Sequence, residues 1–182
     1  MKIKFIEMFF VLFILATLFA CATSFSTQHA TGDDISLRDA KKIHPRSHLT
    51  KRIRDMPLRL DPLAEGKVAY YEARRRKGIY GQDGNIFLFH AEGESGPMRI
   101  LVCVLNRRAH EVVVEGEPRI SNEFLSQFID RSLENSLEIA KDPSDLLTVP
   151  GPIRPEAQAP KSSQAIANAV KMALMFGRIL GL

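Results

Sequence analysis

Two histidines, His90 and His110, stand at the ends of the two predicted outer strands, and we expect them to approach each other where these strands flank the middle one. Glu92, Glu94 and Glu111 lie close to them in the sequence, and an imidazole beside a carboxylate can act as a general base in hydrolysis. Histidines at strand ends are more often simply solvated. A small hydrolase is therefore kept as an alternative function and not as the preferred one.

Known catalytic signatures are missing from the sequence. Gly93-Glu-Ser-Gly96 does not match the G-x-S-x-G sequence of a nucleophile elbow. Neither a phosphate-binding P-loop nor the H-E-x-x-H sequence of zinc proteases occurs. The sequence therefore favours binding over catalysis, and it predicts no cofactor and no small-molecule ligand.

A second histidine pair, His44 and His48, has a spacing that suits a metal site. Residues four apart share one face of a helix, as zinc ligands often do. Pro45 lies between them, however, and no carboxylate or thiol nearby completes a site. We expect no metal here.

The chain has two cysteines, Cys21 and Cys103, and they do not form the even set of a disulfide framework. Cys103 lies in the middle of the most apolar predicted strand, where a thiol behaves as a small buried hydrophobe. Cys21 directly follows the apolar stretch near the N-terminus. It is the candidate for a covalent modification.

The first twenty residues have the layout of an export signal. Lys2 and Lys4 precede the apolar run Met8–Phe19, and small residues follow it. The run is shorter than the roughly 20 residues that a membrane-spanning helix needs. We expect residues 1–20 to be a signal peptide and the protein to be exported, with an uncleaved anchor as the alternative.

The end of this signal, Leu18-Phe19-Ala20-Cys21, resembles the lipobox of bacterial exported lipoproteins. The resemblance implies that Cys21 becomes the first residue of the mature chain and carries acyl groups such as palmitate. It also implies a place in the cell envelope, on the periplasmic side of the outer membrane. The alternative is a secreted protein whose signal is cut after Ala20 or Ala22.

Residues 21–60 are polar and strongly basic, and we expect them to form a flexible tether. From Arg38 to Arg59 the formal charge is +6, from eight basic and two acidic side chains. Such a segment can lie on the anionic headgroups of a membrane surface. Nucleic acid is not an expected partner, because the protein is exported and no aromatic side chains are interleaved for base stacking.

Three short apolar runs predict strands at Ile86–Phe89, Ile100–Leu105 and Val112–Val114. The links between them are short and contain turn residues, which favours an antiparallel meander. Alternation places Val102 and Cys103 on opposite faces, so the middle strand should be covered on both sides. It also places His110, Val112 and Val114 on one shared face.

Two helices are predicted around this sheet. The first covers Pro62–Lys77, and the second begins after Ser121 and ends before Asp142. The second carries an apolar stripe of Leu125, Ile129, Leu133 and Leu137. The predicted fold is an α+β domain over residues 61–145, a small three-stranded antiparallel meander packed by one or two helices.

The segment Met98–Ile129 faintly resembles part of the TPM domain of bacterial and plastid envelope proteins. The shared features are an apolar strand, a turn with the basic pair Arg107-Arg108, a second strand and an acidic loop before a helix. That family has a helix between its first strands where this chain has a Gly-Pro turn. No functional residue is carried over from it.

The C-terminal part begins with a proline-rich linker at residues 146–162. Residues 163–182 then predict an amphipathic helix with Lys171 and Arg178 on its polar side. Three interpretations remain open for this helix. It covers an open face of the sheet, docks into a groove of an envelope partner, or lies in a membrane interface.

Taken together, these features predict an exported, lipid-anchored envelope protein that acts as a non-enzymatic accessory or assembly module. Its lipid anchor and basic tether would contact the membrane surface, and its C-terminal helix would bind a partner. One alternative is a secreted effector or a peptide precursor processed at dibasic sites such as Lys41-Lys42. A second is a small envelope hydrolase.

Overall fold

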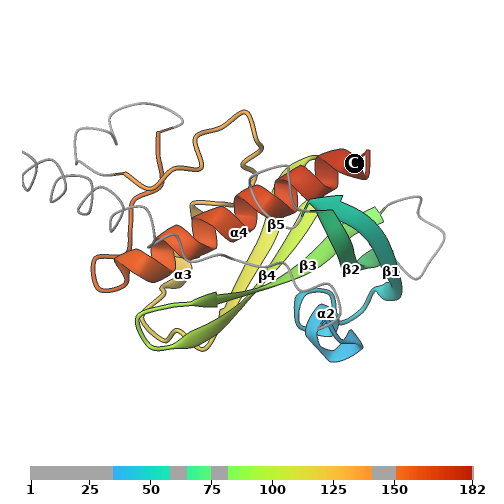
Figure 1. Ribbon diagram of the computed structural model, residues 1–182, viewed down its shortest axis with the longest axis horizontal. Coiled ribbons are helices and arrows are strands. Elements are labelled where there is room, and N and C mark those ends of the chain that lie inside the picture. The colour runs from blue at the N-terminus through green and yellow to red at the C-terminus, as the bar shows by residue number, and fades with distance from the viewer. Residues whose placement is uncertain (1–34, 58–64, 75–81, 141–150, 182) are drawn as a thin grey trace, which may run out of the picture.

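A five-stranded antiparallel sheet forms the centre of the protein in the computed structural model, which describes residues 35–57, 65–74, 82–140 and 151–181 (Figure 1). The strands form a meander in the order β1-β2-β3-β4-β5. Their bounds are His48–Pro57, Glu65–Arg74, Gln82–Glu92, Pro97–Leu105 and Arg108–Glu115. The helices are α2 (Leu37–Ile43), α3 (Asn122–Ser126) and α4 (Pro160–Ile179). The α+β class and the antiparallel meander are confirmed, with five strands in place of the predicted three.

The long helix α4 lies across one face of the sheet and forms the centre of the main core (Figure 1). Twelve of its twenty residues are buried, so it belongs to the interior. Phe176 packs on Phe87 and Phe89 of β3, with ring centroids 5.4 and 6.0 Å away. Gly177 allows a close approach to β4, because a Cβ there would lie 2.7 Å from Cγ1 of Val104. Of the three interpretations of the C-terminal helix, the structure shows the one in which it covers the sheet.

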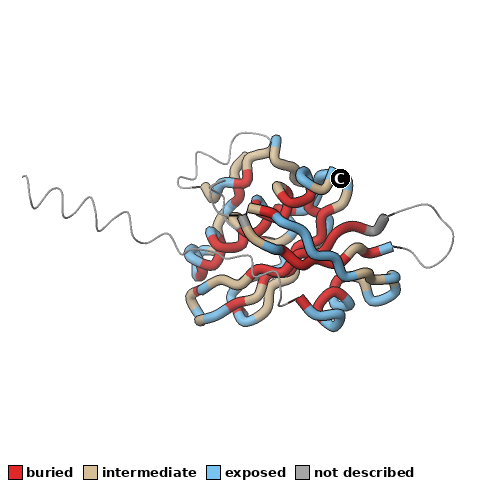
Figure 2. The backbone as a smooth tube through the Cα atoms, turned by 45° about the vertical axis from the view of Figure 1, so that its right-hand side comes forward, coloured by how far each residue is buried: buried red, intermediate tan, exposed pale blue. Residues whose placement is uncertain are grey.

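The short helix α2 covers the opposite face with a smaller apolar cluster. Ala40 and Ile43 of α2 pack in the same cluster as Leu101 and Cys103 of β4. Val102 of the same strand belongs to the core under α4. The predicted alternation of β4 is therefore confirmed, and the strand is buried on both faces. Figure 2 shows the buried positions gathered in the interior between the sheet and the helices.

A bulge in β5 changes the predicted place of His110. Val104 pairs with Ala109 and Cys103 pairs with Glu111, so His110 is an extra residue without a partner position in the ladder. Ala109 lies in the core under α4, whereas the His110 ring stacks beside His44 at the end of α2. The prediction that His110 shares a face with Val112 and Val114 is therefore wrong, because the bulge shifts the alternation by one residue.

The predictions before β3 also differ from the structure. The described part of the expected tether contains α2 and β1, and the expected helix Pro62–Lys77 contains the strand β2. Four successive residues of β2, from Val68 to Tyr71, are buried, as in a strand that is covered on both faces. β1 has no such run of buried residues. Its position depends mainly on the backbone hydrogen bonds of its ladder to β2.

The segment after β5 is only briefly helical. The N-cap prediction is confirmed, since the Ser121 hydroxyl accepts a hydrogen bond from the N–H of Phe124 at 3.1 Å. The helix ends at Ser126, however, and turns follow it, in which Asp130 adopts a left-handed backbone conformation with φ of 63°. The described part of the predicted linker is anchored as well, since Ile153 is fully buried and bridges to Ile139. None of the described helices is long and apolar enough to cross a membrane.

Candidate functional site on the edge strand β1

β1 is an outer strand of the sheet and has a long exposed stretch. It pairs with β2 from His48 opposite Arg74 to Pro57 opposite Glu65. On its other side it has no strand neighbour in the described part of the chain. Residues 51–55 are all exposed, and Met56 is the one buried position of this strand. The side chains of β1 therefore contribute little to the core of the domain.

Basic side chains of β1 lie on both faces of the sheet. Arg52 stands opposite Tyr70, which lies in the core under α4, so Arg52 and Arg54 share the α4 side. Lys51 lies on the side of α2. Arg52 forms an ion pair with Glu72 of β2, with 3.3 Å between Nε and Oε2.

Burial and the charged side chains around Tyr70 affect the pKa of its phenol. Burial raises the pKa of the Tyr70 phenol and the Glu72 carboxylate raises it further, whereas Arg54 and Arg52 act in the opposite direction. The phenol is therefore neutral at physiological pH. Arg52 and Arg54 lie at the surface, and both are exposed.

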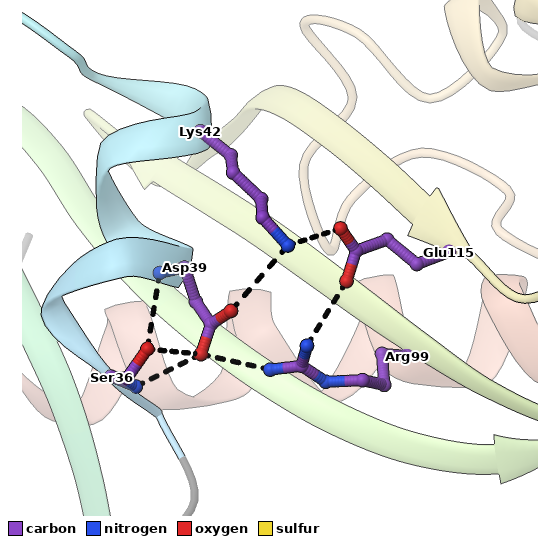
Figure 3. Close-up of polar contacts among 5 residues, drawn as sticks. All are labelled: Ser36, Asp39, Lys42, Arg99 and Glu115. Carbon is purple, nitrogen blue, oxygen red and sulfur yellow. Dashed lines mark hydrogen bonds and ion pairs between the residues drawn. The ribbon is translucent and has the colours of Figure 1, made fainter.

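Polar contacts with Arg99 of β4 and Glu115 of β5 fix α2 on the sheet, as Figure 3 shows. Ser36 and Asp39 form a capping box, in which the N–H of Asp39 donates to the Ser36 hydroxyl and the N–H of Ser36 donates to the Asp39 carboxylate. Asp39 also pairs with Arg99 of β4, at 2.8 Å between Oδ2 and Nη2. Glu115 of β5 pairs with Lys42 and, at 3.1 Å, with Arg99. One connected set of charges thus joins α2, β4 and β5.

Asp39 is the buried member of this set. Burial alone would raise its pKa, but the hydrogen bonds from Ser36 and the charge of Arg99 lower the pKa of Asp39 to about 2. The carboxylate is therefore ionised at neutral pH and holds α2 in one position. Lys42 lies beside the same carboxylate, at 3.6 Å from Oδ1.

The outer residues of α2 continue the positive charge of β1. From Arg38 to Asp55 the chain has seven basic and two acidic side chains, a formal charge of +5. We call the exposed basic residues of α2, of β1 and of the turn between them the basic surface. Its members are Arg38, Lys41, Lys42, Arg46, Lys51, Arg52 and Arg54. Because α2 is fixed by buried contacts, this surface has a defined shape.

A thiol and two imidazoles meet at the end of α2. Nε2 of His44 lies 3.3 Å from Sγ of Cys103, and the His44 and His110 rings stack with centroids 6.2 Å apart. Gly84 makes room for the sulfur, because a Cβ on this residue would lie 2.5 Å from Sγ. Cys103 is fully buried, which agrees with its predicted place in the core.

The predicted histidine pairs are arranged differently in the structure. His90 of β3 stands opposite Arg99, whereas His110 lies near Cys103 at the other end of β4. His44 caps the end of α2 and His48 opens β1, so they do not share a helix. Among the described residues, no three His, Cys, Asp or Glu side chains are grouped to hold a metal ion. The sequence did not indicate the contact between His44 and Cys103, which are 59 residues apart.

A second buried carboxylate, Glu117, also escaped the sequence analysis. It accepts hydrogen bonds from the N–H and the hydroxyl of Ser95, at 2.9 and 2.7 Å, and from the hydroxyl of Ser162, at 2.9 Å. Burial would raise its pKa, but these bonds lower the pKa of Glu117 to about 2. The Glu94 carboxylate accepts hydrogen bonds from the N–H groups of Lys161 and Ser162 at the start of α4. Both glutamates fasten α4 to the turns of the sheet, which is a structural role.

A shallow pocket lies near the end of α4. Its volume is about 130 Å³, and its charged lining residues are Arg107, Glu134 and Arg178. Sites for small organic ligands usually enclose about 300 Å³ or more. The basic surface is therefore the stronger candidate for a functional site.

Cys21, the predicted lipidation site, lies outside the described residues. No protein-family model, no curated protein and no solved structure matches this chain. Its function must therefore be inferred from its own residues and their arrangement.

Proposed function

We propose that this protein is an exported envelope protein, anchored to the membrane through a lipid on Cys21, that acts as a non-enzymatic accessory or assembly module. It binds an acidic partner with its basic surface. The observation that carries this proposal is the edge strand β1, in which five successive residues, 51–55, are exposed and three of them are basic.

The composition of β1 supports a role in recognition. Ile53 is 56% exposed and stands opposite Ala69, so it lies on the α2 side of the sheet together with Lys51, whereas Arg52 and Arg54 lie on the α4 side. The strand buries only Met56 in the core. The exposed side chains of β1 thus contribute little to the core of the domain and are accessible to a partner.

The distance from the anchor to the domain fits this function. Ile35, the first described residue, lies fourteen positions after Cys21, and a chain of that length spans at most about 50 Å. A lipid on Cys21 would keep the basic surface within that distance of the membrane. Partners would then be met in the envelope, and anionic headgroups nearby would add an attraction that salt weakens.

Metabolic labelling with radioactive palmitate tests the anchor. The full chain is expected to incorporate the label and to fractionate with membranes, and Cys21→Ala is expected to lose both properties. Label that persists in Cys21→Ala would contradict the lipidation of this residue. Soluble, unmodified protein would favour the secreted effector, and fragments ending at Lys41-Lys42 would favour the peptide precursor.

A thiol-dependent hydrolase is the second candidate function, because His44 lies 3.3 Å from the Cys103 sulfur. A neighbouring imidazole can activate a thiol as a nucleophile. The sulfur is fully buried, however, so α2 would have to move before a substrate could reach it. Alkylation of the native protein by iodoacetamide, together with ester hydrolysis that Cys103→Ala abolishes, would favour this candidate over binding.

A further inference from the structure

We propose that β1 binds an extended acidic segment of a partner polypeptide as a sixth strand of the sheet. This inference rests on the proposed function and names the class of partner. Backbone groups on the outer side of β1 would form the hydrogen bonds of a new ladder. Lys51, Arg52 and Arg54 would select acidic side chains on the added strand.

The two outer strands of the sheet differ in whether their edges are covered. At β5, the N–H of Ala109 donates to the carbonyl of Arg131, and the N–H of Asp130 donates to the carbonyl of Ala109, both at 2.8 Å. The returning chain thus pairs with the outer edge of β5 at Ala109. At β1, no residue in the described ranges forms a hydrogen bond to the outer side.

An uncovered edge presents a regular row of donors and acceptors. In an antiparallel pair, every second residue of a strand turns its N–H and C=O away from the neighbour. Within residues 51–55, two or three residues therefore offer both groups outward. Only another extended backbone matches this row with hydrogen bonds at the same spacing, which favours a polypeptide over a lipid headgroup.

The side chains of β1 define what the added strand should carry. Residues directly opposite each other in neighbouring strands interact most strongly. Acidic residues are expected opposite Arg52 and Arg54, with an apolar residue opposite Ile53 between them. This acidic–apolar–acidic pattern of the added strand reads the same in both directions, so the added strand can pair with β1 in a parallel or an antiparallel orientation.

A second copy of this chain fits the edge poorly. If two β1 strands paired antiparallel about Ile53, Arg52 of each copy would stand opposite Arg54 of the other on the α4 side, and only Lys51 and Asp55 on the α2 side would form pairs of opposite charge. Like charges placed directly opposite each other destabilise a sheet. Basic residues on an edge strand thus disfavour self-association and favour a partner of opposite charge.

The experiment measures binding of a fluorescent peptide with a central Glu-Ile-Glu to the full mature chain in detergent micelles. Two derivatives carry N-methyl groups on alternate sets of backbone amides, and a further peptide has Lys-Ile-Lys at its centre. Strand addition uses only one set of amides, so one N-methylated peptide should bind like the parent. The other N-methylated peptide and the lysine peptide should bind at least ten-fold more weakly.

Matched protein variants show whether the edge itself is the site. Arg52→Glu/Arg54→Glu should weaken peptide binding at least ten-fold. The control Arg119→Glu/Arg154→Glu changes the net charge equally at exposed positions away from β1 and should leave binding within two-fold. Equal weakening by both double variants would overturn the assignment to β1, since it would reflect net charge alone.

A parallel measurement separates this inference from the proposed function. Phosphatidylglycerol vesicles are mixed with the full-length Cys21→Ala chain, which tests charge-dependent binding without the lipid anchor. Binding to these vesicles that depends on Arg52 and Arg54, with both N-methylated peptides binding like the parent, would overturn strand addition and leave an anchored binding module standing. Absence of charge-dependent binding to peptides and vesicles alike would overturn the proposed function as well.

Discussion

The two edges of the sheet show two different uses of an outer strand. Beyond β5 the chain returns, and Arg131 holds it in place with hydrogen bonds to the carbonyls of Gln127, Ser136 and Gly151. Along β1 the described chain adds no such cover, and the exposed side chains are mainly basic. Substitutions at the β5 edge should therefore lower the unfolding free energy, whereas most substitutions at the β1 edge should weaken binding of a partner.

The largest effect is expected for Arg131→Ala at the covered edge. The substitution removes charged hydrogen bonds to three backbone carbonyls that are partly shielded from water, and it should cost about 4 kcal/mol of unfolding free energy. Urea denaturation followed by circular dichroism measures this change. Arg52→Ala at the open edge is the matched control and should change the stability by less than about 0.5 kcal/mol. Similar losses of unfolding free energy in both variants would show that the two edges do not differ in their contribution to stability.

Acid should destabilise the fold through the two buried carboxylates. The pKa of Asp39 falls from 3.8 to about 2 and that of Glu117 from 4.5 to about 2 on folding. A lowered pKa contributes stability that is complete above the unfolded value and is lost as the pH falls toward the folded value. We therefore expect a loss on the order of 3 kcal/mol between pH 6 and pH 2.

Thermal unfolding measured at several pH values tests this expectation. In Asp39→Asn/Glu117→Gln the unfolding free energy should be lower at neutral pH and should depend less on pH in the same range, with a remaining loss in acid from Glu94, whose pKa is lowered by hydrogen bonds from Ser162 and Lys161. An unchanged pH dependence in this double variant would show that other groups cause the acid sensitivity.

Two neighbouring substitutions sharpen the comparison within β1 itself. Met56 is 1% exposed and packs in the core under α4, so Met56→Ala should cost about 2 kcal/mol. Ile53 is 56% exposed, so Ile53→Ala should change the unfolding free energy by less than about 0.5 kcal/mol. Binding of the acidic peptide should respond in the opposite order, with the larger loss for Ile53→Ala. Equal effects of the two variants on stability would show that β1 is more buried than the structure indicates.

The predictability of the fold follows the strength of the hydrophobic pattern. β4 was predicted together with its two faces, because alternating apolar residues and short turns define a buried central strand. β1 was missed because one buried residue, Met56, gives no pattern, and its position depends on pairing with β2. The sequence predicts a helix where β2 lies, since the buried run from Val68 to Tyr71 has no strand-like alternation.

The candidate site was visible in the sequence as charge but not as shape. The basic run from Arg38 predicts a tether, because contacts such as that of Asp39 with Arg99, which fix α2 on the sheet, join residues that are 60 positions apart. The contact of His44 with Cys103 depends on the same docking of α2. Such long-range pairs leave no local signal in a single sequence.

Native-state hydrogen exchange measured by NMR on the full mature chain tests whether the outer edge of β1 is open in the free protein. We expect alternate amides within residues 51–55 to exchange almost as fast as in an unfolded peptide, while the amides between them are protected by β2. The amides of Ala109 and Asp130 at the covered edge should be protected as well. Uniform protection of all amides from Lys51 to Asp55 in the free protein would show that the β1 edge is covered, and it would contradict the account.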